Sequence, residues 1–167
     1  MILLQRLVHL AFATVLLIAV AHAATKEEAQ ALSDKAADHL AKVGLQQAIA
    51  DFNDPSAGYI DRELFVVIIG SDYKLLCSYG TPVLVGRDTS TLKDADGKMF
   101  DKDIVDLAMS KGSGWVDYHM TNPLTKKVEP KSSWVHRVGD YVVFVGAYPP
   151  LPTPISNCVT SPCAGMT

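Results

Sequence analysis

The strongest constraint on the fold is an uninterrupted apolar and largely β-branched run over residues 64–69, with the sequence LFVVII. The run is too short for a helix in this setting and is typical of a central strand. The turn residues Gly70, Ser71 and Asp72 follow it directly. Residues 74–79 then return as a second strand, so the sequence predicts a β-hairpin at this point.

Residues 25–52 precede this hairpin and have the pattern of a helical segment. Thr25 is suited to the N-cap, and Glu28 stands at the reciprocal capping-box position. Gly44 is expected to stop or bend the helix, and Pro55 belongs to the turn that ends the segment. The apolar residues recur at helical spacing, namely Ala29, Leu32, Ala36, Leu40 and Val43.

The second half of the chain predicts one short helix and three more strands. The helix is expected over residues 101–111, after an irregular segment that begins at residue 81. Gly139 and Asp140 mark a hairpin between the last two strands. The expected strands cover residues 115–120, 132–138 and 141–148. This order predicts an α+β domain with a five-stranded antiparallel sheet and its helices packed on one face.

Within residues 115–120 the side chains alternate between the two faces of the expected strand. One face carries Trp115, Asp117 and His119, and the other carries Val116, Tyr118 and Met120.

The first 23 residues have the three-part pattern of a secretory signal peptide. Arg6 lies in a short basic lead, residues 10–20 are apolar, and Ala21 and Ala23 precede a cut before Ala24. The apolar core is shorter than the ~20 residues of a membrane span. An uncleaved N-terminal anchor is the alternative. We therefore expect a periplasmic or secreted protein with no membrane span after cleavage.

Cleavage at this position divides the chain into three parts. Residues 1–23 are the signal peptide, residues 24–148 form one domain, and residues 149–167 are a proline-rich tail that we expect to be disordered. Cys77 is expected to be a buried small side chain, the alternative being a reactive thiol. Outside the cytoplasm, Cys158 and Cys163 in the tail are the most economical disulfide pair.

Charge and motif content exclude several classes of function. The chain has 15 basic and 18 acidic residues, and Arg6 is the one charged residue before Ala24, so the mature chain is mildly acidic. Nucleic-acid binding requires a basic face, so we expect no nucleic-acid partner. The sequence shows no haem attachment motif, zinc pattern, phosphate loop or nucleophile arrangement. We therefore expect no cofactor, no metal and no enzymatic activity.

Several short motifs follow one another in a specific order over residues 25–148. They include Asp51-Phe52-Asn53-Asp54-Pro55, Gly58-Tyr59, Val85-Gly86-Arg87-Asp88, Leu92-Lys93-Asp94-Ala95-Asp96-Gly97-Lys98, Gly112-Ser113-Gly114-Trp115, Asn122-Pro123, Lys126-Lys127-Val128-Glu129-Pro130-Lys131 and Val138-Gly139-Asp140-Tyr141. Together they resemble a single Cache domain of the second subclass, in its stand-alone secreted form. Cache domains are extracytoplasmic ligand-sensing modules of bacterial chemoreceptors and sensor kinases.

The resemblance implies a PAS-like antiparallel sheet with a long N-terminal helix and a short helix in the segment that covers the sheet. It also implies a pocket between the sheet and the covering segment, with small carboxylates, amino acids or related metabolites as ligands. The sequence departs from the receptor version because it shows no second membrane helix and no signalling module. We therefore expect a soluble binding role.

The expected ligand-binding residues are Tyr59, Arg87, Trp115, Tyr118 and Lys131. Arg87 or Lys131 would clamp a carboxylate through charge-assisted hydrogen bonds. Tyr118 and Trp115 would frame the ligand with apolar walls and polar tips. In the alternative interpretation, the aromatic residues belong to the core and the two cations are solvated.

Two other groups of residues are candidate sites. His119 and His136, with Asp117 nearby, offer a metal or catalytic pair, but a structural role is favoured because a third positioned ligand is missing. The segment beginning Asp94-Ala95-Asp96-Gly97 resembles part of a calcium loop without its distal glutamate, so a turn is expected.

The sequence thus predicts a non-enzymatic, sensor-type protein that binds a small metabolite and presents the bound state to a partner, such as a membrane sensor or receptor. The alternative is a structural or interaction module that keeps the fold without a functional pocket. A third, weaker hypothesis is an enzyme that uses Asp117 and His119.

Overall fold

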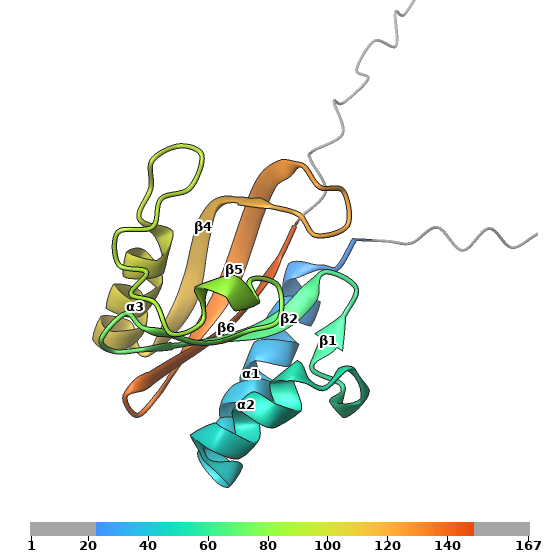
Figure 1. Cartoon of the computed structure of the whole chain (residues 1–167), viewed down its shortest axis with the longest axis vertical. Coiled ribbons are helices and arrows are strands. Elements are labelled where there is room, and N and C mark those ends of the chain that lie inside the picture. Colours follow the sequence, from blue (N-terminus) through green and yellow to red (C-terminus); the bar gives the residue numbers. More distant parts are fainter. Residues whose placement is uncertain (1–22, 149–167) are drawn as a thin grey trace, which may run out of the picture.

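A computed structural model describes residues 23–148 and shows helices packed against an antiparallel sheet (Figure 1). The helices are α1 (Lys26–Val43), α2 (Leu45–Asn53) and α3 (Phe100–Lys111), with short 3₁₀ turns at Pro55–Ala57 and Pro82–Leu84. The strands are β1 (Ile60–Asp61), β2 (Leu64–Gly70), β3 (Leu75–Ser78), β4 (Ser113–Thr121), β5 (Val128–Val138) and β6 (Tyr141–Ala147). Between residues 23 and 148, no helix is long and apolar enough to span a bilayer.

The predicted signal peptide, the tail and the Cys158–Cys163 pairing lie outside the described residues, except for Ala23 at the end of the signal.

The predicted α+β class is confirmed, and every expected helix and strand is present. The sheet has the order β1-β2-β6-β5-β4, and β3 pairs with β2. All the strand pairings are antiparallel. The sheet has six strands rather than five because the two-residue β1 pairs with the start of β2. A strand of two residues is too short to show a period-2 pattern in the sequence.

The capping box and the stop at Gly44 define the ends of α1 as predicted. The Thr25 side chain accepts from the Glu28 backbone N–H, and the Glu28 carboxylate accepts from the Thr25 N–H. Gly44 ends the helix with φ 77°, a conformation that favours glycine. Small residues on α1 allow it to lie close to the sheet, where the Ser33 hydroxyl donates to the Trp134 carbonyl at 3.0 Å.

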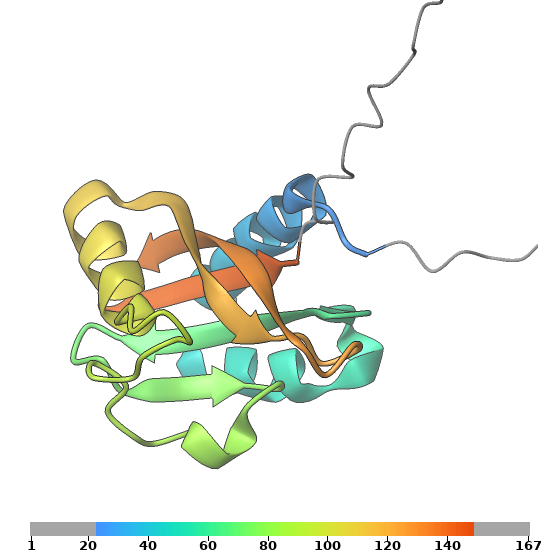
Figure 2. The same cartoon turned by 90° about the horizontal axis from the view of Figure 1, so that it is seen from above.

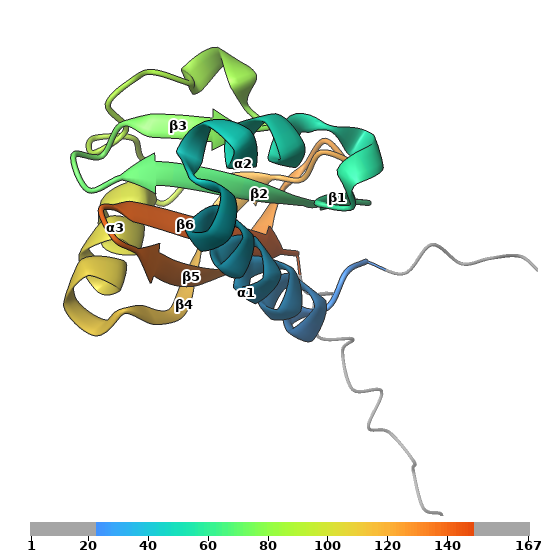
Figure 3. The same ribbon diagram turned by 90° about the horizontal axis from the view of Figure 1, so that it is seen from below.

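The helices lie on both faces of the sheet, which corrects the expectation of one. Alternate residues of β2 point in opposite directions, so Val66 and Ile68 pack with α1 and α2, whereas Val67 and Ile69 pack with α3. Figure 3 shows α1 and α2 crossing one face. The amphipathic α3 needs an apolar surface against which to bury Ile104. It packs on the face of the sheet that α1 does not cover.

Residues 79–99, which we call the covering segment, connect β3 to α3 (Figure 2). Backbone hydrogen bonds attach the segment to β3: Leu75 donates to the Arg87 carbonyl at 2.9 Å and accepts from Gly86 at 2.7 Å. Thr89 donates to the Tyr73 carbonyl. These bonds hold the segment on the α3 side of the sheet.

The Asp94 carboxylate fixes the other end of the covering segment. Its Oδ1 accepts from the backbone of Asp96 and Lys98, both at 2.9 Å, and its Oδ2 accepts from the His119 N–H of β4 at 2.9 Å. The predicted turn at this position is confirmed, and it ties the covering segment to the sheet.

Candidate functional site

A cavity of about 430 Å³ lies between the sheet and the covering segment, where the resemblance places a pocket. Its wall is mainly apolar and includes Phe65, Val67, Leu84, Leu92, Phe100 and Phe144. Small-molecule sites are typically concave and apolar, with a few placed polar groups that set the orientation of the ligand. The polar groups of this cavity are therefore the candidates for recognition.

Lys131 of β5 is the buried cation of the cavity, with 5% of its surface exposed. Its Nζ lies 4.8 Å from the ring centres of both Phe65 and Tyr148. Within residues 23–148 the ammonium has no hydrogen bond or ion pair, so its donors are available to a ligand. Burial lowers the pKa of Lys131 to about 8, and the charges of Glu63 and Asp101 oppose this effect.

The room for the Lys131 side chain comes from Gly146 on the neighbouring strand β6. A Cβ at this position would lie 2.3 Å from Lys131 Cε and 2.3 Å from Ser133 Oγ. Glycine therefore allows the long side chain to cross β6 toward the cavity.

Asp101, in the first turn of α3, supplies an acidic group to the same cavity. The side chain is buried, and this burial raises its pKa to about 6, against the lowering effects of the Thr89 hydroxyl and the charge of Lys131. Asp101 is not among the residues expected from the sequence to bind a ligand. An acid in a first helical turn is expected from the helix dipole alone and gives no sign of a site.

Tyr118 of β4 lies directly opposite Lys131 in the strand pair, and both residues line the cavity. Its ring stacks on Phe100 at 4.6 Å with an angle of 10° between the planes. The Tyr118 hydroxyl and Ser133 Oγ are hydrogen-bonded at 2.8 Å, and burial is the main cause of the raised pKa of Tyr118. Tyr118 thus belongs to the core and to the cavity wall at once.

The structure places the other three expected residues away from the described cavity wall. Tyr59 packs against Phe52 at 4.7 Å, on the sheet face that carries α1 and α2. Trp115 packs against Trp134 at 5.2 Å. Arg87 is exposed in the covering segment. The structure therefore brings Tyr118 and Lys131 together and leaves these three residues apart from them.

A second hollow, of about 370 Å³, contains three side chains that are able to ligate a cation. Atoms of Asp94, Asp96 and His119 lie within 4.8 Å of one another. His119 Nδ1 is 2.6 Å from an Asp96 oxygen, and the Asp94 carboxylate already accepts three backbone hydrogen bonds. These contacts give the cluster a structural role in attaching the covering segment to β4.

The two histidines that could form a pair, His119 and His136, lie toward opposite ends of the β4–β5 strand pair. His119 is opposite Pro130, whereas His136 is opposite Ser113 and contacts Asp34 at 3.0 Å. They do not form a joint site.

Cys77 is buried, as predicted. Burial raises the pKa of its thiol to about 11, and Asn53 Nδ2 donates to the sulfur at 3.4 Å. A thiol in this environment is a poor nucleophile.

An antiparallel sheet with a long N-terminal helix on one face and a cavity under a covering segment on the other makes this chain an α+β domain with a candidate ligand-binding cavity. A family model described as Cache domain matches residues 8–150. The chain therefore belongs to the Cache domain family.

Solved structures of chemotaxis proteins share this fold. A crystal structure of a methyl-accepting chemotaxis protein from Vibrio parahaemolyticus has a TM-score of 0.64 and 20% identity, and the match covers 74% of this chain and 87% of that one. A Cache chemosensory domain, reported for carboxylic acid recognition, has a TM-score of 0.62 and 23% identity, with coverage of 73% and 91%.

A periplasmic sensor domain of a chemotaxis protein has a TM-score of 0.58 and 24% identity, with coverage of 73% and 88%. At these identities the likeness shows the fold. No curated protein sequence matches this chain significantly.

Proposed function

We propose that this chain is an extracytoplasmic binding protein of the sensor type, whose cavity takes a small carboxylate or an amino-acid-like metabolite. The observation that carries the proposal is Lys131, a buried ammonium without a hydrogen-bond partner among the described residues, in a mainly apolar cavity. A buried charge is unfavourable unless it is paired. A ligand carboxylate would supply both the opposite charge and the hydrogen-bond acceptors.

Asp101 supports a ligand that carries a donor besides its carboxylate. A simple monocarboxylate would pair with Lys131 and leave the Asp101 carboxyl without a partner from the ligand. An α-hydroxyl or α-ammonium group would donate to it. Hydroxy acids and amino acids therefore fit the two groups of this cavity better than unsubstituted acids do.

The proposed location and role follow from the family and from the N-terminal sequence. The signal-peptide pattern of residues 1–23 supports export, and one neighbour of the same fold is a periplasmic sensor domain. In this proposal the ligand-bound state is presented to a partner such as a membrane sensor or receptor. A cavity that holds a buried, unpaired cation argues against the alternative of a module without a pocket.

The test is calorimetric titration of the chain beginning at Ala24 with propionate, lactate and alanine at pH 7. Removal of a charge-assisted contact typically weakens binding by ~1.5–3 kcal/mol, or roughly 10- to 100-fold. We expect such a loss in Lys131→Met and no change in the control Arg87→Met, because Arg87 is exposed. Asp101→Asn should weaken the binding of alanine more than the binding of propionate.

Two results would contradict the proposal. One is binding of an acid that Lys131→Met leaves unchanged. The other is the absence of binding by any acid, together with a natively purified chain whose mass spectrum shows no accompanying small molecule.

A further inference from the structure

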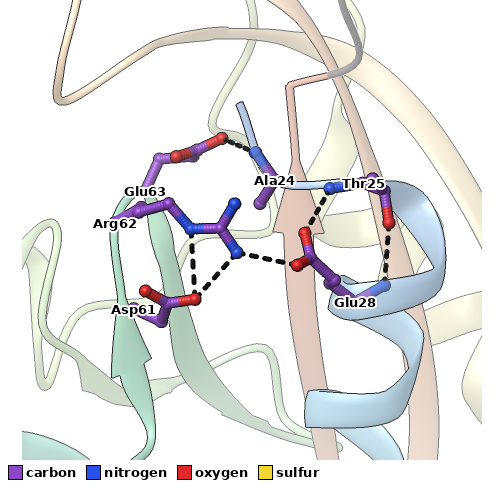
Figure 4. A network of polar contacts seen from close by, with 6 residues as sticks. All are labelled: Ala24, Thr25, Glu28, Asp61, Arg62 and Glu63. Atoms are coloured by element: carbon purple, nitrogen blue, oxygen red, sulfur yellow. Dashed lines mark hydrogen bonds and ion pairs between the residues drawn. The ribbon is translucent and has the colours of Figure 1, made fainter. Parts of the chain in front are cut away.

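The backbone nitrogen of Ala24 is buried against a carboxylate (Figure 4). Ala24 has no exposed surface, and its nitrogen donates to Glu63 Oε1 at 2.6 Å. Glu63 lies between β1 and β2 with 1% of its surface exposed. Its second oxygen, Oε2, is buried without a hydrogen-bond partner in the part of the chain that the structure describes.

In an uncleaved chain, where Ala24 is joined to Ala23 by a peptide bond, the Ala24 nitrogen is a poor partner for the Glu63 carboxylate. A peptide nitrogen offers one hydrogen and no charge, whereas a carboxylate has two oxygens and a negative charge to compensate. Lys131 is a cation whose charge acts on Glu63, but between residues 23 and 148 no ion pair or hydrogen bond joins these two side chains. A buried carboxylate without a direct cation is unfavourable. An α-ammonium at Ala24 would supply three donors and the missing charge.

The signal-peptide pattern places the cut at the bond that would create this ammonium. Ala21 and Ala23 stand three and one positions before Ala24, so cleavage would make Ala24 the first residue. We propose that Glu63 is the binding site of the processed N-terminus, and that cleavage between Ala23 and Ala24 completes the fold through a buried α-ammonium–carboxylate pair.

The proposed reaction is hydrolysis by an endopeptidase of the export machinery. Water adds to the Ala23 carbonyl carbon and the bond to the Ala24 nitrogen breaks. Ala23 leaves with a new carboxylate, and both protons of the water end on the Ala24 nitrogen. Because Ala24 is fully buried in the folded domain, this proposal places cleavage before the domain folds.

Neighbouring contacts hold the N-terminal residues against the turn between β1 and β2. The Glu28 carboxylate accepts from the Thr25 N–H at 2.8 Å and from the Arg62 guanidinium at 3.0 Å. The guanidinium also donates to Asp61 at 2.8 Å (Figure 4). These bonds connect the start of α1 with the turn that carries Glu63, so the Ala24 nitrogen has a fixed position beside the carboxylate.

The test compares the thermal stability of two proteins with different N-termini, each with and without the substitution Glu63→Gln. One protein begins at Ala24, and the other carries two extra residues, Gly-Ser, before Ala24. We expect the extension to lower the Tm by about 5–10 °C, since it removes one partner of a buried ion pair. Glu63→Gln should lower the Tm of the chain that begins at Ala24, and should raise or preserve the Tm of the extended chain.

Asp61→Asn is the matched control, because Asp61 is an exposed acid at the end of β1, two residues before Glu63. It should change the Tm of the chain that begins at Ala24 and the Tm of the extended chain by the same amount. The proposal would be overturned if the two proteins with different N-termini had equal Tm values, or if Glu63→Gln changed the Tm of both by the same amount.

Amine labelling gives a second readout that does not depend on the variants. In the folded, exported protein, the α-amine of Ala24 should resist acylation at pH 8 while exposed lysines react, and unfolding in urea should restore its reaction. Sequencing of the exported protein should begin at Ala24. A different first residue, or an α-amine that reacts freely in the folded chain, would refute the pair with Glu63.

Discussion

Replacement of Lys131 by methionine is expected to stabilise the ligand-free protein while it removes anion binding. Burial lowers the pKa of Lys131 from 10.5 to about 8. Since one pKa unit corresponds to about 1.4 kcal/mol, the ammonium costs about 3 kcal/mol at pH 7. Contacts with the faces of Phe65 and Tyr148 offset part of this cost, by about 0.5–1 kcal/mol each. The expected net gain for Lys131→Met is therefore about 1–2 kcal/mol.

The sign of the pH dependence follows from the same shift. Between pH 8 and pH 10.5 the unfolded wild-type chain binds more protons at position 131 than the folded chain does. Wild-type stability therefore rises with pH relative to Lys131→Met over this interval. The advantage of the variant is fully present below pH 8 and disappears as the pH approaches 10.5.

The assay is urea denaturation of both proteins at pH 7 and pH 10.5. The difference between the two proteins isolates Lys131 because the other titrating groups are common to both. Arg87→Met serves as the control and should change the free energy of unfolding by less than about 0.5 kcal/mol, as is usual for exposed positions. A Lys131→Met protein that is less stable than the wild type at pH 7, or whose stability advantage is the same at both pH values, would refute an energetic cost of the buried ammonium.

Three further substitutions test other parts of the structure. Asp101→Asn should stabilise the protein by about 2–3 kcal/mol above pH 6 and by little near pH 4. Burial raises the pKa of Asp101 to about 6, so the folded protein loses stability when this carboxyl ionises as the pH rises. Urea denaturation of the wild type and the variant at pH 4.5 and pH 7.5 checks this. Gly146→Ala should cost about 1–3 kcal/mol and weaken anion binding, because its Cβ would collide with Lys131 and Ser133; thermal shifts with and without lactate measure both effects. Thr25→Ala should cost about 1 kcal/mol in urea denaturation, through loss of the helix cap.

Much of the fold could be predicted because its signals are local. The capping box at Thr25, the stop at Gly44 and the hairpin at Gly139 and Asp140 each depend on residues a few positions apart, and the structure contains all of them. The β-branched run of residues 64–69 identified the central strand for the same reason. The predicted side-chain alternation in residues 115–120 is also present, with Tyr118 and Met120 on the side of the cavity, since that alternation is a property of the strand itself.

The tertiary structure decided which of these elements meet. The face taken by α3 depends on the surface that α1 and α2 have already covered. Tyr118 and Lys131 lie opposite each other because of the register between β4 and β5. A shift of this register by one residue would place their side chains on opposite faces of the sheet.

By itself, therefore, the sequence determined the helices, every strand except the two-residue β1, the family resemblance and the expectation of an exported small-molecule binder. Only the tertiary structure showed that Asp101 shares a cavity with Lys131 and that Glu63 lies against the Ala24 nitrogen. The physical reason is that burial and charge depend on partners distant in the sequence. Ala24 and Glu63 are 39 residues apart, and no local pattern records what surrounds either of them in the folded chain.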